Sequence, residues 1–140
     1  MAKKKLKKLK KPKKINRGLL VRKIDSQIFR LLIQDRGRKC QLCGKTDQIG
    51  VFHILPKSTH PKLRFYPANL LLTGWFCCHY PFHHDFYKAR DVIVPALEHL
   101  IGRDLISYEL YLKSIEPTMP KLTIGYLESL YEKLRLRVGG

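Results

Sequence analysis

The sequence predicts an α+β fold in which a small, cysteine-rich module containing β-structure is set among α-helices. Two contrasts along the chain support this prediction. Apolar residues recur with helical spacing on both sides of the central region, whereas residues 38–82 carry four prolines and all four cysteines. The chain has 140 residues, of which 44% are hydrophobic, so it can form one domain with a modest core.

The first segment, residues 1–17, is a basic arm. It holds nine lysines and Arg17 with no acidic residue, and the whole chain has a formal net charge of +17. Charge repulsion and a low apolar content predict that this arm is disordered, and they make a polyanion such as DNA the expected partner. The arm would then act as a tether that binds DNA phosphates and neutralises their charge. The alternative is that the arm only makes the protein more soluble. The expected DNA contacts in it include Lys3, Lys4, Lys5, Lys7 and Lys8.

Residues 18–140 are expected to form one domain that begins with a helix over residues 19–36. Apolar residues lie there at i, i+4 spacing, and Gly37 is a plausible stop. The module follows over residues 38–90, with its best short strand at 51–55.

A helical C-terminal part is expected over residues 91–137. The helical pattern returns at His83 and runs to about residue 101, with Pro95 expected to kink or divide it. Two further amphipathic helices are expected at 103–115 and 123–137, separated by a turn that contains two prolines.

The cysteines indicate a structural zinc site. Cys40 and Cys43 have the Cys-x2-Cys spacing that lets two thiolates reach one ion, and Gly44 allows the backbone to turn behind them. Adjacent cysteines rarely both serve one tetrahedral site, so Cys78 and His83 are the expected remaining ligands. Cys77 and His79 are the substitutes.

Residues that suit phosphodiester hydrolysis lie between and after the two cysteine pairs. His53, Asn69 and the His83-His84-Asp85 cluster follow one another in the order seen in HNH nucleases. Histidine can take a proton from water near neutral pH, and an amide can orient that base without titrating. A divalent cation would stabilise the charge on the phosphate.

Residues 53–69, HILPKSTHPKLRFYPAN, resemble the NinG/Rap group of phage recombination HNH nucleases. The resemblance extends over roughly residues 38–136 and includes the Cys-x2-Cys, the second cysteine cluster and the helical tail. It implies a zinc-stabilised ββα-metal (HNH) module, DNA cleavage with Mg²⁺ or Mn²⁺, a role in recombination or replication, and branched DNA among the substrates. The recombination machinery would be a further partner, and resolution of a junction would require two active sites and hence a homodimer.

The resemblance also implies roles for individual residues. His53 would be the general base, Asn69 would orient it, and His84 would bind the catalytic metal ion. His60 would provide a second contact to that metal or to a phosphate. Arg64 would bind the phosphates of the cut strand as a planar fork, with Lys57 and Lys62 as further DNA contacts.

Two other functions are compatible with the same residues. One is a non-catalytic, zinc-stabilised DNA-binding protein with a degenerate HNH module; the other is an RNA- or ribosome-associated zinc protein. No apolar run is long enough for a membrane span and no secretory signal is recognisable, so we expect a cytoplasmic protein that does not bind membranes.

Overall fold

The computed structural model describes residues 16–139 and confirms an α+β fold. The first helix, α2 (Arg17–Arg36), begins two residues earlier than predicted. Asn16 is its N-cap, because the side-chain oxygen accepts the Leu19 N–H at 3.1 Å. Gly37 ends the helix with a φ of 84°, a conformation that glycine adopts without steric cost. The predicted basic arm lies almost entirely outside the described residues.

A two-stranded antiparallel sheet follows. Strand β1 (Ile49–His53) pairs with β2 (Leu70–Gly74), with Ile49 opposite Gly74 and His53 opposite Leu70. The strand predicted at 51–55 therefore begins and ends two residues earlier. His53 is the last residue of β1, at the point where the chain leaves the sheet for the long connection to β2.

Strand β2 is buried on both faces because the sheet lies between two hydrophobic cores. Leu70 and Leu72 face the core formed with α2 and α7 (Ile124–Arg137), whereas Leu71 faces a second core. The second core includes Leu97 from α5 (Val94–Ile101) and Leu112 from α6 (Leu105–Ile115). This double burial explains the continuous leucine run in β2, which lacks the alternation of a half-exposed strand.

Short helical segments connect the sheet to α5. A π-helical turn, Trp75–His79, leads into α3 (Tyr80–His84), and α4 (Phe86–Lys88) and a second π-helical turn, Ala89–Ile93, follow. Asp85 separates α3 from α4 and caps α4 by accepting the Lys88 N–H. Pro95 lies in the first turn of α5, directly after the second π-helical turn. The predicted helices at 103–115 and 123–137 are confirmed within two residues at their starts.

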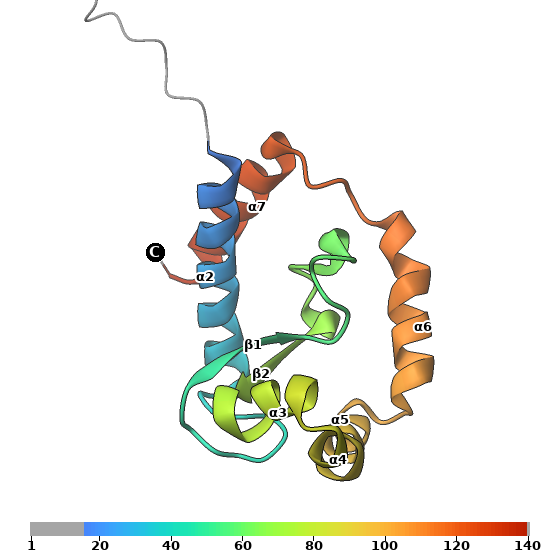
Figure 1. Cartoon of the computed structure of the whole chain (residues 1–140). Helices are drawn as coiled ribbons and strands as arrows, with labels where there is room; N and C mark the ends of the chain where they lie inside the picture. Colours follow the sequence, from blue (N-terminus) through green and yellow to red (C-terminus); the bar gives the residue numbers. More distant parts are fainter. Residues whose placement is uncertain (1–15, 140) are drawn as a thin grey trace, which may run out of the picture.

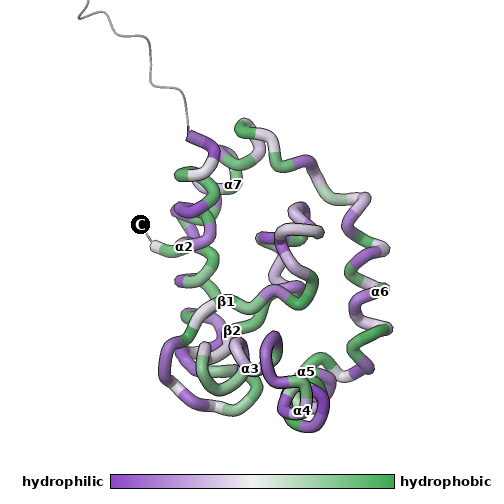
Figure 2. Tube along the Cα trace, in the orientation of Figure 1, coloured by the Kyte–Doolittle hydropathy of each residue, from purple (hydrophilic) through white to green (hydrophobic). Residues whose placement is uncertain are grey.

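Helices α2 and α7 lie side by side on one side of the molecule, and α6 lies on the other, with the connection between the strands between them (Figure 1). Figure 2 shows apolar residues along the strands and mixed polar and apolar residues along the long helices. Arg17 at the start of α2 donates a hydrogen bond to the Leu122 carbonyl just before α7. Within residues 16–139, no helix has both the length and the apolarity needed to cross a bilayer.

Candidate functional site

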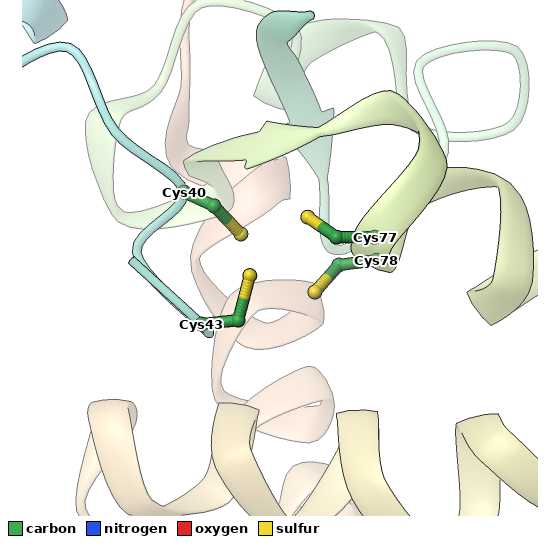
Figure 3. A group of neighbouring side chains, drawn as sticks. All are labelled: Cys40, Cys43, Cys77 and Cys78. Atoms are coloured by element: carbon green, nitrogen blue, oxygen red, sulfur yellow. The ribbon is translucent and has the colours of Figure 1, made fainter. Parts of the chain in front are cut away.

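The four cysteines form one cluster. The Sγ atoms of Cys40, Cys43, Cys77 and Cys78 all lie within 4.8 Å of one another, and all four are free thiols. Figure 3 shows the sulfurs pointing toward one another, two from the loop after α2 and two from the turn after β2. Four sulfur ligands in such a group are the donor set of a closed structural zinc site, so the cluster could hold a metal ion such as zinc.

Local backbone geometry produces this convergence. Gly44 has a φ of 81° and donates its N–H to the Cys40 carbonyl, which closes the turn between the first two cysteines. On the other side, Gly74 leaves room for a sulfur, since a Cβ there would lie 2.5 Å from the Cys77 Sγ. Any larger residue at position 74 would therefore displace Cys77 from the cluster.

The structure corrects the predicted fourth ligand, because Cys77 and not His83 joins the other three cysteines. The expectation that adjacent cysteines do not share one site overlooked the conformation of the chain at that point. Cys77 and Cys78 lie on a π-helical turn, where successive side chains project in neighbouring directions around the axis and can both reach one side. On a strand they would point to opposite faces.

The protonation of the four thiols depends on their burial and on how closely they lie to one another. Burial raises the pKa of Cys77 to about 11, and its cysteine neighbours contribute, while burial and the nearby Cys40 raise the pKa of Cys78 further. Burial also raises the pKa of Cys40, but hydrogen bonds from backbone N–H groups, that of Gly74 first, outweigh it and bring the value to about 7. A divalent cation would offset the repulsion between sulfurs and favour four thiolates, so the donor set fits zinc.

A second group of polar residues lines a cavity with a volume of about 460 Å³. Three histidines contribute to its wall, from β1, from the π-helical turn and from α3. Two basic residues, one aspartate from α2 and several apolar side chains complete it. The polar members are His53, His79, His83, Lys57, Ser58, Arg64 and Asp25.

His53 is held at this cavity in one tautomer. Its Nε2 lies 3.0 Å from the Arg64 carbonyl oxygen, which can only accept a hydrogen bond. The Nε2 atom therefore carries the proton, and Nδ1 is the nitrogen that can accept one. Burial lowers the pKa of His53, and the positive charge of Lys57 adds to this, so the imidazole is neutral at pH 7.

Asn69 lies at the base of the strand connection and is fully buried. Its Oδ1 accepts the Leu55 N–H at 2.7 Å, and its Nδ2 donates to the carbonyls of Leu55 and Leu63. The Asn69 carbonyl also accepts the Ile54 N–H at 2.9 Å. Asn69 thus fixes the two residues that follow His53, and it influences the position of His53 through the backbone without facing the cavity.

The cavity wall contains a pair of histidines that the sequence analysis did not place together, and His84 is not part of that wall. His79 and His83 are separated by four residues on successive helical turns and line the cavity with a ring-centroid distance of 5.5 Å. His84 points elsewhere and stacks on Tyr80 at 4.2 Å. Burial lowers the pKa of His79, with smaller effects from His83 and His53, which keeps this imidazole neutral as a metal ligand must be. The i, i+4 spacing was the available signal for this pair.

The other predicted contacts divide into two groups. Arg64 and Lys57 line the cavity, and the Arg64 guanidinium is held by Asp25 through bonds of 3.1 and 2.5 Å. His60 instead pairs with Glu116 at 2.8 Å, and Lys62 lines a separate hollow near α7. Neither residue contributes to the cavity wall as predicted. The arm lysines Lys3, Lys4, Lys5, Lys7 and Lys8 lie outside the described residues.

No protein-family model, curated protein or solved structure matches the chain.

Proposed function

We propose that the protein is a metal-dependent DNA endonuclease with an HNH, or ββα-metal, active site in the histidine-lined cavity. The observation that carries this proposal is the convergence of His53, His79 and His83 with Arg64 and Lys57 around one space. Proton acceptors, neutral imidazole ligands and fixed cations are the components that phosphodiester hydrolysis requires. The order β1, β2, α3, with one histidine on the first strand and one on the helix, supports the ββα assignment.

In this proposal His53 is the general base. Its Nδ1 takes a proton from the attacking water, and the Arg64 carbonyl stabilises the imidazolium through its hydrogen bond with Nε2. Asn69 keeps the chain after His53 in place by binding both backbone polar groups of Leu55. Asn69 is therefore a positioning residue and makes no contact with the reacting atoms.

His79 and His83 would hold the catalytic divalent ion. Their imidazoles project from one helical face, which is the arrangement by which two histidines at i, i+4 bind one metal ion. When bound, the ion would supply positive charge to the phosphate oxygens of the transition state. Nitrogen ligands favour transition metals over Mg²⁺, so we expect Mn²⁺ to support the reaction at lower concentrations than Mg²⁺.

The basic residues bind the DNA. Asp25 fixes the Arg64 guanidinium at the cavity, where it would meet a phosphate beside the cut, and Lys57 would add a second cation. The net charge of +17, of which residues 1–17 contribute +10, would attract DNA. The cysteine cluster would bind a structural zinc ion that fixes β2 against the loop after α2.

The proposal is tested by incubating the full-length, zinc-loaded protein with duplex, nicked, branched and single-stranded DNA. Each substrate is tested without added divalent metal and with Mg²⁺, Mn²⁺ or Ni²⁺. Strand cleavage that requires the added metal is the expected result. If no substrate is cut with any of these metals, the nuclease function is excluded, and a non-catalytic DNA-binding function remains.

A further inference from the structure

Two aromatic rings beside the cavity are partly exposed. Trp75 and Tyr80 are 43% and 47% exposed, so nearly half of each residue's surface faces solvent. Neither ring belongs to the two hydrophobic cores or to the apolar side chains packed against them. Packing in a core therefore does not account for these two side chains, and their exposed faces need another explanation.

These rings are continuous with the candidate active site. Trp75 lies 4.9 Å from His79, one of the cavity histidines, and 5.7 Å from Tyr80 between ring centroids. Tyr80 in turn stacks on His84 at 4.2 Å with an interplanar angle of 27°. The rings of His79, Trp75, Tyr80 and His84 are thus in contact one after another, beginning with His79 at the cavity wall.

We propose that Trp75 and Tyr80 form a stacking platform for an unpaired base of the DNA strand that enters the cavity. This inference rests on the proposed function, which it deepens by specifying DNA with unpaired nucleotides beside the cut as the substrate class. A base in a continuous duplex is stacked on both faces and offers no ring to this platform. An unpaired base at a flap, at a junction or in a single-stranded segment has a ring face that can stack on this platform.

The surroundings favour a nucleic-acid strand as the occupant. Every base has a π-face that can stack on an exposed aromatic ring, and the strand's phosphates would meet the cations of a strongly basic chain. Arg64 and Lys57 line the same cavity as His79, against which Trp75 packs. An apolar protein partner would leave these positive charges without a counterion, whereas a DNA strand would bind the rings through its bases and the cations through its phosphates.

Trp75 provides a direct test because it is the only tryptophan in the chain. Zinc-loaded protein is titrated with a dT oligonucleotide, with no Mg²⁺ or Mn²⁺ added and no chelator present, and tryptophan fluorescence is recorded. We expect dT to quench this emission, because a stacked base contacts the indole, and we expect a blunt duplex of equal nucleotide content to leave it largely unchanged. Quenching by an rU oligonucleotide but not by dT would overturn the assignment to DNA.

Variants separate stacking from phosphate binding. Affinity for a labelled dT oligonucleotide, measured by anisotropy, should fall at least about fivefold in Trp75→Ala. The slope of log affinity against log salt should be unchanged, since no cation is lost. Trp75→Phe should retain most of the affinity, because it keeps an aromatic face. Ile106→Ala removes a more exposed apolar side chain, 73% exposed on α6, and should bind dT as the wild type does.

The outcomes distinguish this inference from the proposed function. If the wild type cuts DNA but Trp75→Ala with a full zinc content binds dT normally, the platform is refuted and the nuclease stands. If dT quenches Trp75 and Trp75→Ala binds weakly while no DNA is ever cut, the platform stands and the nuclease is refuted. Loss of affinity in Trp75→Phe equal to that in Trp75→Ala would also contradict stacking.

Discussion

Asn69 holds both backbone polar groups of Leu55, accepting its N–H at 2.7 Å and donating to its carbonyl at 3.1 Å. Leu55 lies two residues after His53, so this pair joins the end of β1 to the start of β2 across the long connection between them. A third bond, to the Leu63 carbonyl, holds the middle of the connection. The position of the candidate base therefore depends on one buried amide.

Replacing Asn69 with alanine should lower the free energy of unfolding by about 2–4 kcal/mol, because it removes three hydrogen bonds and leaves the buried Leu55 N–H without its acceptor. Urea unfolding of the zinc-loaded protein measures this change. Thr59→Ala is the matched control, since its hydroxyl bonds the Pro56 carbonyl at an exposed site in the same connection. The control should change stability by less than about 0.5 kcal/mol. Equal effects of the two substitutions would contradict the role assigned to Asn69.

The metal content tests the corrected ligand set. The wild type should carry about one zinc ion per chain, and Cys77→Ser should lose it and unfold the module, because a three-sulfur site binds zinc far more weakly. His83→Ala should keep its zinc, since His83 lines the cavity instead. Elemental analysis combined with circular dichroism measures both. Zinc loss from His83→Ala with retention in Cys77→Ser would restore the ligand set that the sequence suggested.

The dependence of cleavage on metal concentration tests whether His83 or His84 binds the catalytic ion. His83→Ala removes one of the two imidazoles proposed to hold the catalytic ion, so the Mn²⁺ concentration at half-maximal rate should rise at least about tenfold. His84→Ala is the matched control, because its ring stacks on Tyr80, and its metal midpoint should equal that of the wild type. A raised midpoint in His84→Ala alone would show that the catalytic ion lies elsewhere.

The pH profile tests the environment of His53. Burial lowers the pKa of this imidazole from its ordinary value of 6.5, and the Lys57 charge contributes. A protonated imidazole cannot accept a proton, so kcat/KM should fall as the pH drops through a midpoint below 6.5. Lys57→Met removes the neighbouring charge and should move this midpoint to higher pH. A midpoint that is unaffected by Lys57→Met would contradict the assignment of the acidic limb to His53.

Most of the fold could be predicted because its helices bury clear apolar stripes. The α2 stripe and the two C-terminal helices follow helical periodicity, and their ends lie within two residues of the expected positions. Strand β2 was not located as a strand, since burial on both faces removes the alternation that identifies one. The π-helical turn at Trp75–His79 also escaped prediction, because it depends on the tertiary packing of the cysteine cluster.

The candidate site was predictable where a residue's role follows from its place in the chain. His53 lies on a strand, and Cys78 joins Cys40 and Cys43, as the sequence predicted. Cys77 takes the place expected for His83, and His84, His60 and Lys62 do not line the cavity. Which of His79, His83 and His84 face the cavity depends on the helical phase after β2, and the unforeseen π-helical turn sets that phase. Spacing alone could not supply this information.

The most direct test of the account is the single-turnover cleavage rate of His53→Ala at saturating protein and Mn²⁺. If His53 is the general base, the substitution should slow cleavage at least about 100-fold while zinc content, DNA affinity and the metal midpoint stay at wild-type values. If His53→Ala cuts DNA as fast as the wild type, His53 takes no part in the chemical step.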